Sequence, residues 1–156
     1  MPLLDLIQFS RELANRRNKA ALLLTSDVRE QHQIAAQLAT ALGAPHLDVL
    51  DRFQADAKLT EQIASFAPAD FFKLVAKEKS APLLVISGLE FLLAIWVAQG
   101  DAKQVKLDLC RQIELWEQKP AFLLVAQQDS IFANYTPTRH TGSQVIIQLS
   151  QTLALA

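Results

Sequence analysis

Apolar residues along this chain gather in short continuous runs, and between the runs they recur every three or four positions. A short apolar run bounded by turn residues is typical of a strand buried on both faces, whereas the wider spacing is typical of an amphipathic helix. The runs predict five strands: AALLLT at 20–25, a weaker one at 47–50, PLLVIS at 82–87, AFLLVA at 121–126 and QVIIQL at 144–149.

Helical segments alternate with these strands. The predicted helices cover residues 2–17, 30–42, part of 51–67 around 59–66, 68–75, 91–98, and a segment after Asp101 with the stripe Val105, Leu109, Ile113 and Trp116. Gly43 is a natural stop for the second of these helices, and Asp101 can cap the last one. The segment 127–142 is polar and is interpreted as a loop.

Alternation of buried strands with helices indicates a parallel sheet that is covered on both faces. We therefore expect an α/β fold, a three-layer α/β/α sandwich around a mostly parallel five-stranded sheet. By analogy with AAA-type domains, the expected strand order is 5-1-4-3-2. The length of 156 residues fits one domain spanning 1–156, because the chain shows no repeat or linker.

Composition narrows the classes of partner. The chain has 15 basic and 16 acidic residues, so it has no overall attraction to nucleic acid or to an anionic membrane. Its one cysteine, Cys110, excludes an internal disulfide and a cysteine zinc site, and it suits a reducing cytoplasm. We expect Cys110 to be a buried, inert thiol. The longest apolar run, 91–98, is too short to cross a bilayer, so we expect a cytoplasmic protein without a membrane partner.

The turn after the first strand is where a parallel α/β domain would hold a phosphate group. Residues 26–33 read SDVREQHQ, and their length and placement match the phosphate-loop motif G-x-x-x-x-G-K-[ST]. Ser26 and Gln31 stand at the glycine positions, His32 at the lysine position and Gln33 at the Ser/Thr position. The glycines let backbone N–H groups wrap phosphates, the lysine supplies charge and the hydroxyl binds magnesium, so every required feature is replaced.

Two interpretations of this loop remain open. In one, it is a changed nucleotide site that still uses His32 and Glu90. In the other, which we favour, it is an ordinary loop and helix start in which Ser26 or Asp27 caps the helix.

The end of the third strand supports the second interpretation. A magnesium-binding aspartate is expected there, but the chain has Ser87, with Glu90 three residues later. We therefore predict no catalytic residue and no cofactor, only a vestigial nucleotide site at Ser26, His32, Gln33, Ser87 and Glu90; ATP with magnesium would bind only under the alternative.

The order of segments resembles the small P-loop protein of BREX phage-defence systems, the BrxF-type family. The similarity runs from about 22 to 149 and includes the strand–loop–helix at 20–42, LLVISGLEFLL, FLLVA and NYTPTRHTG. It implies a P-loop NTPase fold and a cytoplasmic protein that acts with larger partners in restricting phage DNA. A degenerate AAA-type module, such as a clamp-loader subunit that no longer hydrolyses ATP, would show the same pattern.

Basic residues gather in three groups that could contact phosphates. These are Arg11, Arg16, Arg17 and Lys19; Lys73, Lys77 and Lys79; and Arg139 with Tyr135 and His140. The candidate nucleic-acid contacts are Arg16, Arg17, Lys73, Lys77 and Arg139. The alternative is a solvated surface of helices with extended lysine stems.

The remaining signals favour binding over catalysis. His32, His46 and His140 lack ligand spacing, so no metal site is predicted. Trp96 lies in an almost wholly apolar helix, which is core or part of a partner interface. We expect a non-catalytic, pseudo-ATPase-like assembly protein that acts with partner proteins, or with a second copy of itself, in a nucleic-acid transaction such as phage defence. The alternatives are a nucleotide-binding ATPase and a DNA-binding accessory module.

Overall fold

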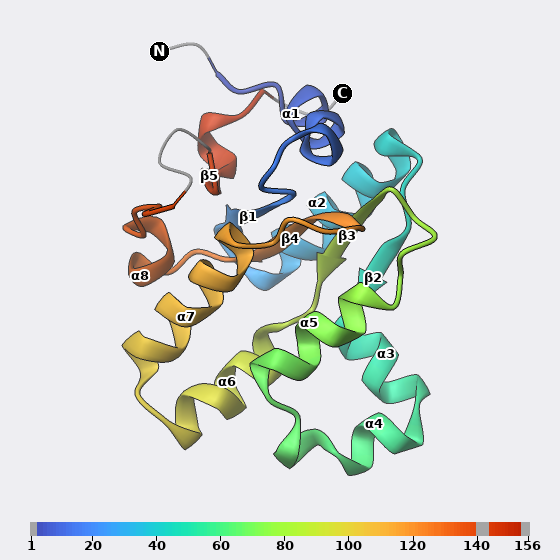
Figure 1. Ribbon diagram of the computed structural model, residues 1–156, viewed down its shortest axis with the longest axis vertical. Helices are drawn as coiled ribbons and strands as arrows, with labels where there is room; N and C mark the ends of the chain where they lie inside the picture. The colour runs from blue at the N-terminus through green and yellow to red at the C-terminus, as the bar shows by residue number, and fades with distance from the viewer. Residues whose placement is uncertain (1–2, 140–143, 154–156) are drawn as a thin grey trace.

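The computed structural model describes residues 3–139 and 144–153, and it contains one all-parallel sheet of five strands. The strands are β1 (Ala20–Thr25), β2 (His46–Asp48), β3 (Leu83–Ser87), β4 (Ala121–Gln127) and β5 (Ile146–Gln148). Their order across the sheet is β2-β3-β4-β1-β5, as Figure 1 shows. Counted from the other edge this is 5-1-4-3-2, so the predicted α/β class and strand order are confirmed.

The continuous apolar runs explain which strands are central. β1 pairs with β4 along its whole length, from Ala20 opposite Phe122 to Thr25 opposite Gln127. Neighbouring side chains of β1 enter different cores, since Leu22 belongs to one buried cluster and Leu23 to the other. A strand with apolar contacts on both faces needs no polar alternation. The edge strands β2 and β5 are only three residues long each.

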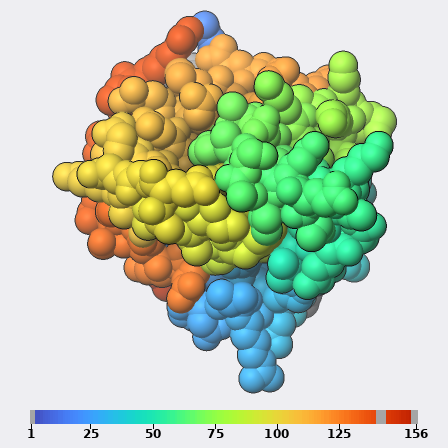
Figure 2. All heavy atoms as spheres, turned by 90° about the horizontal axis from the view of Figure 1, so that it is seen from below, coloured from blue at the N-terminus to red at the C-terminus, as the bar shows by residue number. Residues whose placement is uncertain are grey.

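Helices cover both faces of the sheet. One face holds α1 (Leu6–Glu12) and α2 (Val28–Leu42), whose buried residues join one core cluster. The other holds α3 (Val49–Ala55), α5 (Pro68–Ala76), α6 (Glu90–Gln99), α7 (Ala102–Glu114) and the short α8 (Ser130–Ala133), with α4 (Ala57–Glu61) beyond α3. Seen from below in Figure 2, the yellow α6 lies beside both the gold α7 and the green α5, and the blue α2 lies on the opposite side.

Aspartate side chains set where most helices begin. Six helices follow an aspartate whose carboxylate accepts a backbone N–H of the first turn: Asp5, Asp27, Asp48, Asp56, Asp101 and Asp129. Such caps satisfy donors that have no partner within the helix. The predicted cap at Asp101 is therefore confirmed, and Asp27 rather than Ser26 caps α2.

The same caps explain where the predicted boundaries were wrong. The strand predicted at 47–50 ends at Asp48, because its carboxylate accepts the Asp51 N–H at 3.2 Å and starts α3 at Val49. The loop predicted at 127–142 contains α8, which Asp129 caps and the buried Phe132 anchors. The first predicted helix is shorter, comprising α1 and a 3-10 turn at Leu13–Asn15, and the predicted 59–66 helix is α4 followed by a 3-10 turn at Ile63–Ser65.

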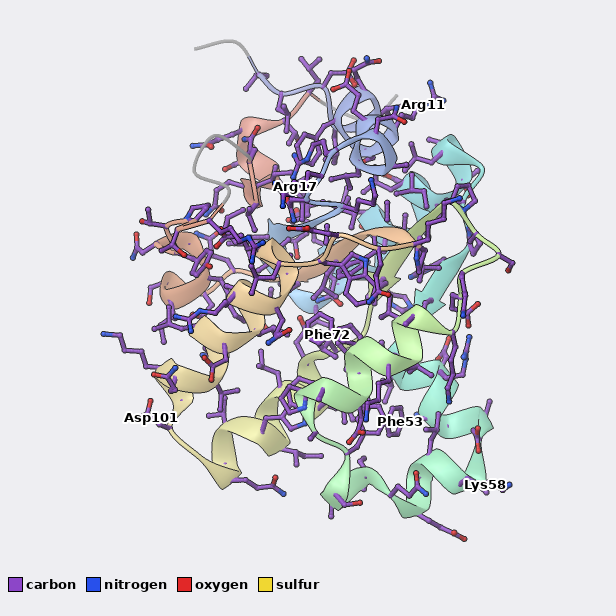
Figure 3. All side chains as sticks on the ribbon, viewed as in Figure 1. Arg11, Arg17, Phe53, Lys58, Phe72 and Asp101 are labelled. Atoms are coloured by element: carbon purple, nitrogen blue, oxygen red, sulfur yellow. The ribbon has the colours of Figure 1, made fainter. Side chains whose placement is uncertain are left out.

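Aromatic side chains fill the larger core. Phe53 and Phe72 come from α3 and α5, on the same side of the sheet in Figure 3. Trp96 is buried and donates from Nε1 to the Phe66 carbonyl at 2.7 Å, so it belongs to this core. Cys110 is also buried, and burial first, then Asp129, raises the pKa of its thiol to about 12. None of the helices in the described residues has the length and apolar character needed to cross a bilayer.

Candidate functional site

Polar side chains meet where β1, β3 and β4 end. These strands are neighbours in the order β3-β4-β1 and run parallel, so their carboxyl ends share one edge of the sheet. Ligands of parallel α/β proteins usually bind at this edge. We call the residues gathered there the strand-end site: Ser26, Glu30, Gln31, Gly88, Glu90 and Gln127.

Gln31 is the centre of the strand-end site. Its side chain is buried, with 1% of its surface exposed, and it comes from the first turns of α2. Nε2 donates to Glu90 Oε1 at 2.7 Å, and Oε1 accepts the Gly88 N–H at 2.9 Å. Glu90 Oε1 also accepts the Gln127 N–H at 3.0 Å. One amide and one carboxylate thus join α2, the β3–α6 turn and the end of β4.

The loop after β1 is closed by its own carboxylates. Glu30 Oε1 accepts both the Ser26 N–H at 2.9 Å and the Ser26 hydroxyl at 3.0 Å. Asp27 Oδ1 accepts the Glu30 N–H at 2.8 Å, and the Asp27 carbonyl accepts the Gln31 N–H at 3.0 Å. Three donors of this loop, the N–H groups of Ser26, Glu30 and Gln31, are therefore bonded within the chain and are not free to hold a phosphate.

Carboxylates outnumber basic side chains at this edge, since the loop at 26–33 has Arg29 as its one lysine or arginine. Asp27, Glu30 and Glu90 supply three carboxylates, and within residues 3–139 and 144–153 no lysine or arginine forms an ion pair or hydrogen bond with any of them. A polyphosphate needs the reverse, cations and free N–H donors. The arrangement is suited to holding three segments of the fold together rather than to binding an anion.

The other predicted site residues, His32, Gln33 and Ser87, do not take part in these hydrogen bonds. His32 is 61% exposed, and its Nε2 lies 3.3 Å from Asp48 Oδ2, at the end of β2. Gln33 is exposed next to it on α2. Ser87 is fully buried at the end of β3. The structure thus places Ser26 and Glu90 at the same edge of the sheet, where Ser26 bonds to Glu30 and Glu90 bonds to Gln31 and Gln127, but His32 contacts Asp48 of β2 instead.

A contact between His46 and Ser87 was not predicted from the sequence. His46 Nε2 lies 2.7 Å from Ser87 Oγ, because β2 pairs with β3 in a register that sets Asp48 opposite Ser87. Burial lowers the pKa of His46, and His32 lowers it further, against the opposing effect of Asp48 and Asp51. Ser87 has no exposed surface, so its hydroxyl is out of reach of a substrate. The signal that was missed is the register of β2 on β3, which sets His46, the first residue of β2, opposite Val85 and so two positions from Ser87 along the neighbouring strand.

Histidines 32 and 46 approach each other, but they do not make a metal centre. Their ring centroids are 6.2 Å apart. No group of three His, Cys, Asp or Glu side chains within the described residues has the geometry to hold a metal ion. The third histidine, His140, lies outside the described residues.

Gly88 sits where the backbone turns from β3 into α6. Its φ of +76° lies in the left-handed region, and a Cβ at this position would collide with the Asp48 carboxylate and approach the Leu50 backbone nitrogen to 3.2 Å. Glycine is the residue that tolerates both conditions. The turn therefore fixes β2 and β3 against each other directly beside Gln31.

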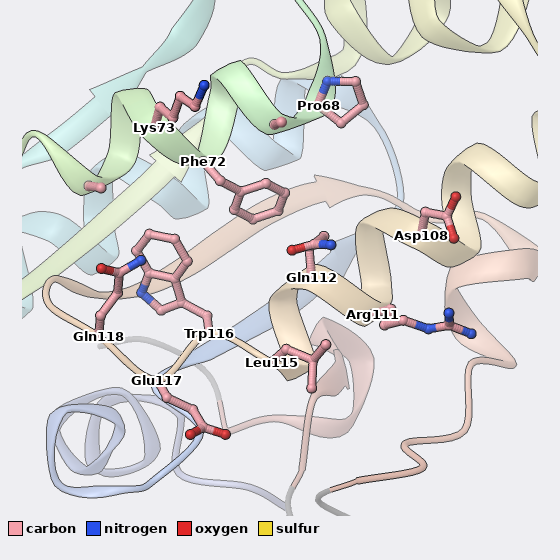
Figure 4. Close-up of a pocket in the computed structure, with 12 residues that line it drawn as sticks. Pro68, Phe72, Lys73, Asp108, Arg111, Gln112, Leu115, Trp116, Glu117 and Gln118 are labelled. Carbon is pink, nitrogen blue, oxygen red and sulfur yellow. The ribbon is translucent and has the colours of Figure 1, made fainter.

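Two hollows of the surface bear on function. A cavity of about 310 Å³ adjoins Glu90 and Gln127, lined by Leu93, Ala94 and Val97 of α6, by Phe132, and by the Lys106–Asp129 ion pair of 2.5 Å. A larger groove of about 680 Å³ lies elsewhere, between α5 and α7, as Figure 4 shows. The bigger volume is therefore not at the strand-end site.

Some of the predicted nucleic-acid contacts already bond to other parts of the chain, and others do not. The Arg16 guanidinium donates to the Gln144 carbonyl at 3.2 Å and lies over the Phe9 ring, and Arg17 pairs with Glu117 at 3.5 Å. The Arg139 backbone N–H donates to Glu114 Oε2 at 2.7 Å. Figure 3 shows Arg11 near the end of the molecule opposite Lys58, with Arg17 between it and the sheet. Lys73 on α5 and Lys77, which directly follows this helix, are exposed and make no ion pair with the described residues.

Comparisons with protein-family models and with curated proteins found no match to this chain. Function must therefore be inferred from the chemistry of the strand-end site and from the surface around it.

Proposed function

We propose that this protein is a pseudo-ATPase: a P-loop-like domain that acts by binding partner proteins and not by hydrolysing a nucleotide. The strand order β2-β3-β4-β1-β5 and the placement of SDVREQHQ after β1 support the P-loop assignment. The observation that carries the loss of nucleotide chemistry is the pair of hydrogen bonds from Ser26 to Glu30. The Glu30 carboxylate occupies the N–H and the hydroxyl of Ser26, two donors that a phosphate could otherwise use.

Electrostatic repulsion opposes the replacement of the Glu30 carboxylate by a phosphate group. A phosphate oxygen replacing Glu30 Oε1 would have to approach the carboxylates of Asp27, Glu30 and Glu90 without a neutralising lysine at position 32. Two like charges about 4 Å apart repel by roughly 1–4 kcal/mol, depending on how far solvent screens them. The summed repulsion of several such pairs is larger than the stabilisation that the remaining N–H donors of this loop would give a bound phosphate.

A domain without nucleotide chemistry acts through what it binds. The resemblance in segment order to the BREX protein supports partners in a nucleic-acid transaction, with phage defence as the setting. A degenerate AAA-type subunit would act in the same way, by packing against other subunits. We propose, accordingly, that the protein acts in the cytoplasm and binds partner proteins there.

Titration calorimetry with ATP and magnesium tests the proposal. We expect no heat beyond dilution with the full chain, and the same result with His32→Ala. Saturable ATP binding that His32→Ala abolishes, and that the remote control Lys58→Ala leaves intact, would contradict the proposed loss of nucleotide binding and would favour a nucleotide-binding ATPase.

A further inference from the structure

The cavity of about 310 Å³ beside the strand-end site is lined by side chains from α6, α7, α8 and the end of β4. On α6 these are Glu90, Leu93, Ala94 and Val97, which are three or four positions apart and so share one face of the helix. Phe132 of α8 adds an aromatic wall. One acid at the start of the α6 face is therefore followed by hydrocarbon surface.

Three charged side chains line the cavity, and their charges do not balance. Lys106 and Asp129 form an ion pair of 2.5 Å, so they neutralise each other. The remaining charge is the carboxylate of Glu90, which forms no ion pair with any described residue. With two carboxylates against one ammonium group, the lining carries a net negative charge.

The fold supplies Glu90 with two hydrogen-bond donors, and both are neutral. Oε1 accepts from Gln31 Nε2 at 2.7 Å and from the Gln127 N–H at 3.0 Å. These bonds hold the carboxylate in position and leave its charge in place. Oε2 accepts no hydrogen bond from the described residues, and it is not sealed inside the fold, since no buried side-chain oxygen or nitrogen among them lacks a partner. Glu90 thus has one accessible oxygen without a donor.

We propose that this cavity, the α6–α8 cavity, binds a small organic cation: an ammonium or guanidinium group carried on an apolar body. The cation pairs with Glu90 Oε2, and the body packs against Leu93, Val97 and Phe132. The volume lies at the lower end of the range for small-molecule sites, which favours a small ligand over a segment of a partner protein. The inference goes beyond the proposed function, because it requires neither a partner protein nor a nucleotide.

Other classes of ligand fit this lining less well. An anion would meet a net negative charge, and the one ammonium group, that of Lys106, is already paired. A neutral apolar molecule would cover the Glu90 carboxylate without giving it a partner, and removing an unpaired charge from water is costly. A metal ion would have too few ligands, because no group of three suitable side chains exists within the described residues.

Three probes with the same phenylethyl body test the proposal. Phenethylamine carries a cation, phenethyl alcohol a neutral hydroxyl and phenylpropionate an anion. Each is titrated into the isotope-labelled full chain, and the backbone amide signals are followed by NMR. We expect saturable shifts at Leu93, Val97 and Gln127 with phenethylamine, with a Kd on the order of 1 mM for so small a ligand. The alcohol should bind roughly tenfold more weakly, and the anion more weakly still.

Variants of the cavity separate the effect of charge from that of shape. Glu90→Gln keeps an oxygen for the donors of Gln31 and Gln127 but removes the charge, so phenethylamine should bind roughly tenfold more weakly and phenethyl alcohol as before. Glu12→Gln removes the same charge from an exposed position of α1, on the opposite face of the sheet, and should leave both affinities unchanged. Ala94→Trp fills the cavity from an exposed position and should weaken both ligands.

The proposal fails if phenethylamine gives no saturable shifts at the cavity, or if the alcohol or the anion binds as tightly. It also fails if a Glu90→Gln chain that circular dichroism shows to be folded binds the amine as the wild type does. Should that variant not fold, unchanged amine binding in Ala94→Trp is the contradicting result. Tighter binding of a short peptide whose only charge is a lysine side chain would assign the cavity to a partner protein and not to a small molecule.

Discussion

The Gln31 side chain donates to Glu90 Oε1 at 2.7 Å across 59 positions of sequence, and its own oxygen accepts the Gly88 N–H at 2.9 Å. Gln31 occupies the position of a glycine in the phosphate-loop pattern, yet it is a buried structural link between α2 and the β3–α6 turn. The position that would give a nucleotide-binding loop its freedom instead holds two segments rigidly together.

Removing this link should destabilise the fold. In Gln31→Ala, the Gly88 N–H loses its acceptor and Glu90 Oε1 loses one of its two donors, so we expect the free energy of unfolding to fall by about 2–3 kcal/mol. Gln31→Gly, which restores the motif residue, should cost at least as much because glycine also weakens the helix. Urea denaturation measures both. The exposed neighbour Gln33→Ala is the control, and an equal loss there would refute the structural role.

Three glycines offer an internally controlled series. Gly88→Ala meets a positive φ and the Asp48 carboxylate, Gly43→Ala meets only a positive φ of 62°, and Gly100→Ala meets ordinary contacts, the nearest at 3.7 Å. We expect losses of about 2–4, about 1 and less than about 0.5 kcal/mol in that order. Thermal and urea unfolding of the three variants measure these losses of stability. A Gly88→Ala variant as stable as Gly100→Ala would mean that the turn is not packed against Asp48.

His46 should make stability depend on pH. Its pKa in the folded state lies below the ordinary value, chiefly through burial, so the unfolded chain takes up the proton more readily. The contribution of the neutral side chain is therefore complete above about pH 6.5 and is lost as the pH falls below that value. Unfolding free energies measured between neutral and mildly acidic pH should fall less steeply in His46→Gln than in the wild type. In the exposed control His32→Gln, the His46 part of the slope should persist; identical slopes in wild type and His46→Gln would disprove this assignment.

The strands and the sheet order could be predicted because burial on both faces leaves a direct mark on the sequence. The runs at 20–25, 82–87 and 121–126 match β1, β3 and β4 to within one residue at either end. Boundaries set by one side chain were harder. Asp48 ends β2 and starts α3 within a run, 47–50, whose apolar residues suggest a longer strand.

The candidate site was predictable only in part, because its contacts depend on which strands are neighbours. The loop after β1 was located correctly, between Thr25 and Val28; that its replaced glycines and lysine abolish phosphate binding stays a prediction. The link from Gln31 to Glu90 and the contact from His46 to Ser87 were missed, since each joins elements that are far apart in sequence. Periodicity shows which face of a helix is buried, but not which polar group a buried amide will meet.

Asn18 closes the far end of α7 in a comparable way and gives a last prediction. Its side chain is buried, and Nδ2 donates to the carbonyls of Ile113 at 3.0 Å and Glu114 at 2.9 Å. These belong to the last carbonyls of the helix, which have no partner within it. Asn18→Ala would leave two buried acceptors without this donor, and we expect unfolding to become easier by about 2–3 kcal/mol. The exposed Asn15→Ala should change stability by less than about 0.5 kcal/mol. Equal stability of the two variants in urea would contradict this role of Asn18. It would mean that water replaces the Asn18 amide at the carbonyls of Ile113 and Glu114.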